Sequence, residues 1–228
     1  MKAVHRITVL LADDHLIVRE GLRNLLMTEK DIEVIGEAAN GREAVELALK
    51  LCPAVVVIDM SMPQINGLEA TRQILKGVPG VKVIILSAHS DDAYVESAIA
   101  VGASGYLIKQ ASALFLSESI RKVLRGELVF SPSVARHFAK RLHELPAQKD
   151  LSQTQAPRLS SRETEVLQMT AEGLQNKEIA CALGISTKTS EKHRYNLMQK
   201  LDIHDTAGLT RYAITTGVID AALLCISQ

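Results

Sequence analysis

Five side chains that could do chemistry stand at the ends of apolar stretches in the first half of the chain. They are Asp13, Asp14, Asp59, Ser87 and Lys109. The stretch before Asp59 is the most informative: five apolar residues, four of them β-branched, run directly into the carboxylate, and Pro63 follows. Such a run is typical of a strand that is buried on both faces. Asp59 would then lie at the carboxyl end of a buried strand, where open α/β sheets form their sites.

Together, these residue types indicate phosphoryl chemistry. If the first and third strands are neighbours, three carboxylates meet in one crevice, where like charges raise one another's pKa unless a cation neutralises them. Such oxygen ligands suit Mg²⁺ held by one or two carboxylates. A phosphoryl group at this place would meet the metal, the ammonium group of Lys109 and the hydroxyl group of Ser87. Asp59 is placed to be the attacking carboxylate.

Each residue alone also has an ordinary structural explanation. An aspartate after a strand often forms a turn or caps the next helix, and a predicted helix follows Asp14 at once. Ser87 could simply end a strand, and Lys109 could be a solvated charge. The presence of carboxylates, a hydroxyl and a lysine at the same edge of four strands favours a functional site.

The elements that must position these residues alternate in type from residue 7 to residue 126. Strand-like runs cover residues 7–12, 32–38, 54–59, 81–87 and 105–108, and helical patterns cover residues 15–28, 41–51, 67–76, 91–101 and 112–125. Strict alternation predicts an α/β domain in which helices cover both faces of a parallel sheet.

Residues 4–126 closely resemble the receiver domain of two-component response regulators. The motifs that carry the resemblance are Asp13-Asp14, the D-x-x-M-P sequence from Asp59 to Pro63 with Gly67 following, Ser87-Ala88, and the run from Gly105 to Lys109. The resemblance implies a flavodoxin-like fold of five strand–helix units with sheet order 2-1-3-4-5. The residue after the lysine is often Pro or Asp in that family and is Gln110 here, which leaves open the shape of the turn after the fifth strand.

By the same resemblance, a sensor histidine kinase would pass a phosphoryl group to Asp59. The carboxylates of Asp14 and Asp59 and the backbone carbonyl of Ser61 would bind Mg²⁺. Asp13 would act largely through metal-bound water, and Lys109 would pair with the phosphoryl oxygens.

Composition bounds the class of protein. The chain has 228 residues, which suits one large or two ordinary domains. Basic and acidic residues number 26 each, so the overall charge gives no indication of a nucleic-acid partner. The three cysteines form no CxxC pair, and we expect them to be reduced and structural in a cytoplasmic protein. No apolar stretch approaches the length of a membrane span, so we expect no membrane association.

The second half of the chain predicts a separate domain. Residues 127–157 lose periodicity and predict a linker between a first domain at 1–126 and a second, all-α domain at 158–228. The signals in this second domain are an N-cap at Ser160 or Ser161, a short helix at 176–182, a left-handed turn at Gly184, a helix at 187–201 capped by Ser186, and a last helix at about 207–217. A short helix, a glycine turn and a longer capped helix are typical of a helix-turn-helix.

The longer helix, at residues 187–201, carries an excess of basic residues that the overall charge of the chain does not reveal. From residue 188 to residue 200, basic residues outnumber acidic ones by four to one. An ordinary amphipathic helix with a solvated basic face would show the same charges. However, residues 159–201 closely match the LuxR-type helix-turn-helix of the NarL/FixJ response regulators. Ser190 departs from that family, which usually has Val there, and we expect its hydroxyl to loosen the helix packing slightly.

This second resemblance implies a role in binding double-stranded DNA. Side chains facing base edges would be Glu191, Lys192 and Tyr195, and those meeting phosphates would be Lys177, Lys188 and Arg194. The helix after Asp205 resembles the family's dimer-forming element, so a homodimer on phosphorylation or on DNA is expected.

The sequence thus predicts a transcription regulator that is controlled by phosphorylation and is not an enzyme, apart from possible self-dephosphorylation. By the resemblance to receiver domains, Ser87 and Tyr106 would be the switch pair. Phosphorylation would draw them inward and bias the surface around the fourth and fifth strands between two states. Two alternatives remain open at this point. One is a DNA-binding regulator that acts without phosphorylation, and the other is a Mg²⁺-dependent phosphohydrolase.

Overall fold

The computed structural model describes residues 6–88, 90, 92–132, 134–135 and 159–219. Contacts divide the chain into two compact units, residues 1–144 and 145–228. The border between them falls within the segment 127–157 that was predicted to be a linker, and most of that segment lies outside the described residues.

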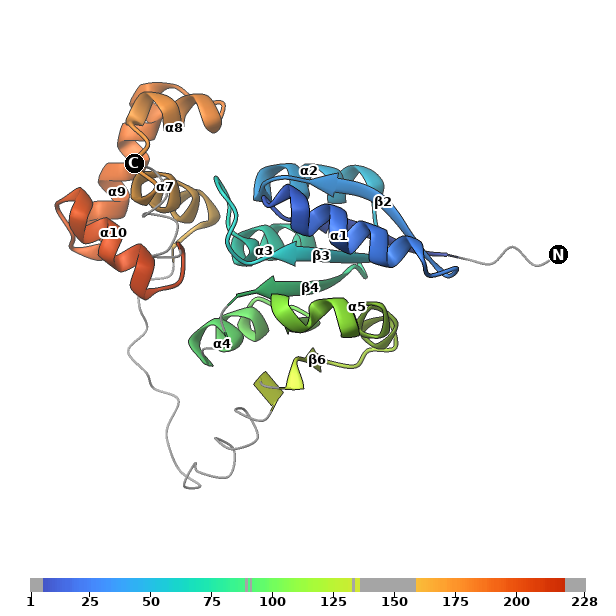
Figure 1. Ribbon diagram of the computed structural model, residues 1–228. Helices are drawn as coiled ribbons and strands as arrows, with labels where there is room; N and C mark the ends of the chain where they lie inside the picture. Colours follow the sequence, from blue (N-terminus) through green and yellow to red (C-terminus); the bar gives the residue numbers. More distant parts are fainter. Residues whose placement is uncertain (1–5, 89, 91, 133, 136–158, 220–228) are drawn as a thin grey trace, which may run out of the picture. The chain divides into compact units, whose positions relative to one another are not determined.

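The first unit is built on a single parallel sheet (Figure 1). Its strands are β1 (Ile7–Ala12), β2 (Ile32–Ala38), β3 (Val55–Asp59), β4 (Lys82–Ser87), β5 (Gly105–Ile108) and β6 (Val129–Phe130). They lie in the order β2-β1-β3-β4-β5-β6, which confirms the predicted order 2-1-3-4-5 and adds one edge strand. β6 lies inside the predicted linker. A pair of residues is too short to carry a periodic signal, so the strand exists only through its pairing with β5.

Helices cover both faces of this sheet, as the alternation predicts. They are α1 (Leu16–Met27), α2 (Gly41–Leu51), α3 (Gly67–Gly77), α4 (Asp92–Ala100) and α5 (Lys109–Leu124). Leucines of α1 and apolar residues of α5 pack on one face of the sheet, while α2, α3 and α4 close the other face with Ala, Val and Ile side chains. Strand β3, which is aliphatic up to its last residue, Asp59, is buried along its whole length between these two layers.

The last of these helices begins three residues earlier than predicted. α5 starts at Lys109, directly after β5, rather than at residue 112. No glycine or proline stands between strand and helix, and Lys and Gln are both good helix formers. The presence of Gln110 therefore lets the helix begin at the lysine, and Lys109 is held by two regular elements at once.

The second unit consists of four described helices. They are α7 (Ser161–Ala171), α8 (Asn176–Ala182), α9 (Thr187–Leu201) and α10 (Thr206–Thr215). The predicted caps are present: Ser160 forms a capping box with Glu163, and the Ser186 side chain accepts from the Thr189 amide. Gly184 has φ +62, so the left-handed turn between α8 and α9 is also confirmed. Apolar residues of all four helices form one core.

Two hydroxyl groups are buried in this unit without a partner among the described residues. Ser190 on α9 and Thr170 on α7 are 0% and 1% exposed, and neither side-chain oxygen makes a hydrogen bond. A buried hydroxyl that has lost its water costs about 1–3 kcal/mol. This cost is the physical reason for expecting that Ser190 loosens the packing of α9.

Replacing Ser190 with Ala should therefore stabilise the second unit. The change removes the unpartnered hydroxyl and adds a stronger helix former, so the free energy of unfolding in urea should rise by about 1 kcal/mol. The matched control is Ser186→Ala on the same helix, which loses a cap that bonds the Thr189 amide at 3.1 Å and should destabilise by about 1 kcal/mol. A loss of stability in Ser190→Ala would show that its hydroxyl has a partner.

Candidate functional site

The three aspartates predicted to converge are brought together at one edge of the sheet. β1 and β3 are adjacent strands in register from Val9 to Ala12, so Asp13 and Asp59 emerge side by side. These two residues are only 1% and 2% exposed, and Asp14 is half-buried. Ligand atoms of the three aspartates and of His15 all lie within 4.8 Å of one another.

Lys109 pairs with two of these carboxylates. Its Nζ lies 2.9 Å from Asp13 Oδ2 and 3.0 Å from Asp59 Oδ1. Burial lowers the pKa of Lys109, but the negative charges of Asp59 and Asp13 raise it more, so the net pKa is above its usual value and the side chain is a cation. The site therefore holds its one lysine between two buried acids.

Asp59 is the most perturbed acid of the cluster. Burial raises the pKa of Asp59 to about 7; Lys109 opposes this rise, and the charges of Asp13 and Asp14 add to it. Its second oxygen, Oδ2, is buried and makes no hydrogen bond with any described residue. One oxygen is thus held by the lysine, and the other is available to a ligand.

His15 is part of the site, although the sequence indicated it only as the start of a helix. Its Nδ1 lies 2.7 Å from Asp14 Oδ1 and 3.3 Å from Asp13 Oδ1. Its backbone amide also donates to Asp13 Oδ1 at 2.9 Å. The signal was present in the sequence, because a histidine directly after two aspartates at a strand end must lie beside them.

Arg19 supports the loop that carries the aspartates, a role that no sequence pattern indicates. Its Nη1 donates to the backbone carbonyl of Asp13 at 2.6 Å, and its Nε donates to Glu37 Oε2 at 3.2 Å. The Arg19 side chain is 13% exposed. The guanidinium group thus links the end of β1 to β2 and to α1.

The loop after Asp59 is fixed by two close backbone approaches. A Cβ atom at Gly67 would lie 2.2 Å from the carbonyl oxygen of Asp59, and one at Gly41 would lie 1.8 Å from that of Ile65. The Gly67 amide also donates to the Met60 carbonyl at 2.8 Å. Only glycine fits at these two positions, so the loop containing Ser61 is pressed against α2 and α3.

The two predicted switch residues lie on neighbouring strands. Ser87 ends β4 opposite Ile108, and Tyr106 on β5 is opposite Ile85. They are 1% and 0% exposed, so both side chains are already inside the first unit. The inward movement expected on phosphorylation stays a prediction.

The donor set of this edge fits Mg²⁺. Three carboxylates offer oxygen atoms at mutual distances suited to one small cation, and the unpartnered Asp59 Oδ2 adds a buried ligand atom. Mg²⁺ prefers such oxygen ligands and retains several waters. Three acids exceed the single lysine in charge, so a divalent cation would also relieve their repulsion.

In the second unit, the predicted DNA contacts divide into two groups. The first group is exposed on the surface of α8 and α9 and consists of Lys177, Lys188, Glu191, Lys192 and Tyr195. Arg194 differs, because its Nη2 donates to Thr206 Oγ1 at 2.6 Å and its Nη1 to Asn176 Oδ1 at 3.4 Å. The guanidinium group thus ties α9 to the first residues of α8 and α10, a tertiary use that helical periodicity does not reveal.

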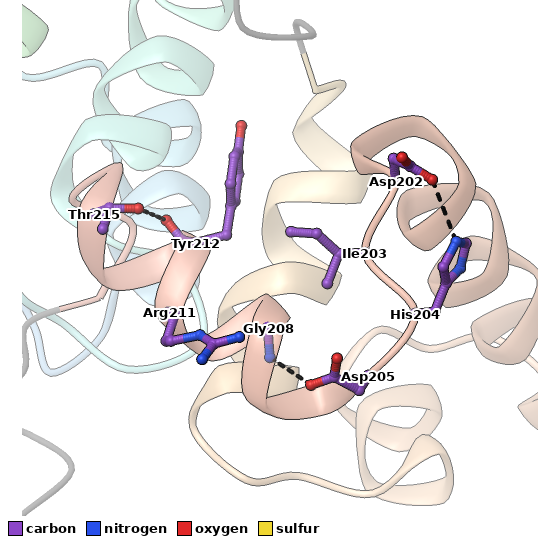
Figure 2. Close-up of a pocket in the computed structure, with 8 residues that line it drawn as sticks. All are labelled: Asp202, Ile203, His204, Asp205, Gly208, Arg211, Tyr212 and Thr215. Atoms are coloured by element: carbon purple, nitrogen blue, oxygen red, sulfur yellow. Dashed lines mark hydrogen bonds and ion pairs between the residues drawn. The ribbon is translucent and has the colours of Figure 1, made fainter.

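A groove lies beside the helix that was expected to form dimers. Figure 2 shows side chains of α10 and of the turn before it around this groove, which is lined by Asp202, Ile203, His204, Asp205, Gly208, Arg211, Tyr212 and Thr215. Asp205 caps α10 by accepting from the Gly208 amide at 2.7 Å, and His204 Nε2 lies 3.3 Å from Asp202 Oδ1. The polar rim is therefore ordered by contacts within the unit.

Comparison with known proteins identifies both units. Residues 9–121 match the response regulator receiver domain, and residues 157–213 match the bacterial regulatory proteins of the luxR family. The chain belongs to the NarL/FixJ family of response regulators. Members of this family are DNA-binding transcription regulators rather than classical enzymes, so the phosphohydrolase alternative finds no support.

Family relatives resemble the chain along nearly its whole length. The response regulator protein VraR of Staphylococcus aureus is 37% identical over 93% of this chain and 99% of its own length. The transcriptional regulatory protein DegU of Brevibacillus brevis is 34% identical over 93% of this chain and 95% of its own. The RcsB response regulator of Salmonella typhimurium matches with a TM-score of 0.56 and 27% identity over 92% of this chain and 99% of that chain. RcsB has also been solved as dimers bound to DNA.

The described residues of this response regulator contain no helix with the length and apolar character that a membrane crossing requires. Cys52 and Cys181 are free, as expected, but both are exposed rather than part of a core.

The raised pKa of Asp59 predicts a pH-dependent stability in the absence of divalent metal. Because the folded state binds the Asp59 proton more tightly than the unfolded state, wild-type stability should fall as pH rises from about 4 to about 7 and level off above. Asp59→Asn cannot titrate, so whatever its stability at low pH, its free energy of unfolding should rise relative to that of wild type by roughly 3–4 kcal/mol across that range. Urea unfolding at several pH values, in the presence of a chelator of divalent metal, measures the stability of wild type and of Asp59→Asn.

The control for this experiment is Asp202→Asn, because Asp202 is an exposed aspartate in the other unit. Its stability should follow the wild-type pH curve. Parallel curves for wild type and Asp59→Asn would contradict the perturbed ionisation of Asp59.

The contacts of Arg194 predict that it does not contact a phosphate. Lys188→Ala should lower the slope of log affinity against log salt concentration by about one, because one fewer counterion is released. Arg194→Met should leave that slope unchanged and instead lower the stability of the second unit by about 1 kcal/mol. DNA titrations at several salt concentrations measure the slope for each variant. An equal decrease of the slope in both variants would show that Arg194 contacts a phosphate.

Proposed function

We propose that Asp59 accepts a phosphoryl group from a sensor histidine kinase and that this modification raises the affinity of the chain for its operator DNA. The observation that carries the proposal is the state of the Asp59 carboxylate. One oxygen lies 3.0 Å from Lys109 Nζ, and the other is buried without a hydrogen-bond partner among the described residues. A carboxylate held in this way presents one oxygen to an incoming phosphorus atom.

The groups that this chain contributes to the transfer all lie at this edge of the sheet. Asp59 Oδ2 attacks the phosphorus of a phosphohistidine, and the O–P bond forms as the P–N bond breaks, with its electron pair returning to the imidazole. The Lys109 ammonium group then pairs with an oxygen of the negatively charged phosphoryl group. Burial excludes bulk water, which strengthens this pairing.

Mg²⁺ would be held by Asp13, Asp14, Asp59 and the backbone carbonyl of Ser61, with Asp13 acting mainly through metal-bound water. When bound, the ion supplies positive charge that offsets the charge of the transferring group. Asp13 keeps Lys109 in place from the other side, at 2.9 Å. His15 would have to release Asp14, since its Nδ1 lies 2.7 Å from the Asp14 carboxylate.

Transmission from the site would run through β4 and β5. Lys109 follows β5 directly, and Ser87 ends the adjacent strand β4. A phosphoryl group that accepted from Ser87 would pull the end of β4 toward Asp59 and change the packing around the buried Tyr106. We therefore assign Ser87 and Tyr106 to the switch.

On DNA, α9 would enter the major groove. Exposed Glu191, Lys192 and Tyr195 would face base edges, while Lys177 and Lys188 would meet phosphates. The dimers that RcsB forms on DNA support a homodimer bound to a two-fold site, with α10 at the contact between copies. The chain would act in the cytoplasm, where the chromosome lies, and its only catalytic activity would be loss of its own phosphoryl group.

Intact-mass measurement with a small-molecule phosphodonor and Mg²⁺ tests the proposed acceptor. Wild type should gain one phosphoryl group, and Asp59→Asn should gain none, because an amide oxygen is a poor nucleophile. Asp202→Asn should be labelled like wild type. Labelling of Asp59→Asn at the wild-type level would place the acceptor elsewhere, and omission of Mg²⁺ should slow labelling of wild type.

A further inference from the structure

The recognition helix carries one acidic side chain on its exposed basic surface. Between residues 188 and 200, Glu191 is the single acid among four basic residues. It is exposed, and its carboxylate makes no hydrogen bond or ion pair with any described residue. The other acids of α7 and α8 that face neighbouring groups serve as caps or pair with arginine and lysine, as Glu163 and Glu178 do. Glu191 has no such structural use.

Glu191 shares a face with the side chains proposed to meet DNA. Residues 188, 191, 192 and 195 recur at helical spacing and are all exposed, with Tyr195 62% exposed. The opposite face of α9 is fixed in the core by Ser190 and Leu197, each 0% exposed. The helix therefore cannot turn Glu191 away from a groove that Lys188 and Lys192 enter.

A carboxylate in this position is repelled by the phosphates unless a base donor compensates it. In the major groove only two base groups donate: the amino group of cytosine and that of adenine. Adenine carries its N7 acceptor beside the donor, so it matches an amide, which both accepts and donates. A carboxylate only accepts, and cytosine presents its amino group without that neighbouring acceptor.

We infer that Glu191 is a specificity-determining residue that accepts a hydrogen bond from the amino group of a cytosine in each operator half-site. The inference rests on the proposed DNA-binding role of α9 and deepens it, because it names the base that this helix selects. A dimer on a two-fold site would read the same C·G pair twice, once in each half-site.

A single-atom change in the Glu191 side chain should change which base it prefers. Glu191→Gln keeps the length of the side chain and replaces one acceptor oxygen with a donor, which suits the N6 and N7 atoms of adenine. Discrimination at that position should therefore move from C·G to A·T. A good base contact corresponds to about 5–150-fold in relative affinity.

The test is selection from a random duplex library by the full-length chain, treated with phosphodonor and Mg²⁺. Wild type should enrich a two-fold motif with one strongly preferred C·G pair per half-site. Glu191→Gln should enrich the same motif with A·T at that pair and no change elsewhere. The matched control is Asp202→Asn, which changes an exposed acid to its amide at the other end of α9 at a position with φ +54 that Asn tolerates; its motif should equal that of wild type.

Three results would overturn the inference, and they differ in what else they reject. If wild type enriches a motif that Glu191→Gln leaves unchanged, Glu191 reads no base, while the DNA-binding role stands. A gain in affinity for all sequences without a change of motif has the same meaning, because it reports only the removal of a repulsive charge. If wild type enriches no motif, the proposed function fails together with the inference. Unchanged melting of Glu191→Gln ensures that none of these results reflects misfolding.

Discussion

The ion pairs of Lys109 with Asp59 and Asp13 are the interaction on which the rest of the first unit depends. These charged groups have left water, and burial by itself favours the neutral forms of Lys109 and Asp59, as the opposing effects on their two pKa values indicate. Removing one partner of a buried pair costs about 3–5 kcal/mol, since the other charge is left uncompensated. With three acids and one lysine, the cluster is short of positive charge, which explains why it suits a divalent cation and a lysine-bound phosphoryl group.

This charge cluster requires strand ends that do not move. β1, β3 and β5 supply Asp13, Asp59 and Lys109, and Lys109 is fixed further because α5 begins at that residue. Arg19 holds the Asp13 carbonyl from behind, and Gly67 lets α3 approach the Asp59 backbone closely. The aliphatic strands, packed between two helical layers, hold the acidic groups close together in an environment of low dielectric constant.

Sequence predicted the parts of this arrangement that depend on local pattern. The buried run before Asp59, the alternation of strands and helices and the caps at Ser160 and Ser186 are all signals within a short window, and the order of the strands followed from the family resemblance. Contacts made across the fold were missed. Arg19 and Arg194 were not recognised as links between elements, because a guanidinium group on a helix looks the same in sequence whether it meets solvent, phosphate or a neighbouring carbonyl. β6 was missed because two residues carry no period, and its existence depends on pairing with β5.

Phosphorylation of Asp59 is proposed to control DNA binding by the second unit of the chain. The most direct test measures the affinity of the full-length chain for one duplex, chosen by selection, before and after stoichiometric phosphorylation at fixed salt concentration. We expect phosphorylation to tighten binding by about 5–150-fold, the usual range of coupling between two sites, and treatment with phosphodonor to leave the affinity of Asp59→Asn unchanged. Equal affinity of the phosphorylated and unphosphorylated chain would contradict this proposal and favour a regulator whose receiver acts without phosphorylation.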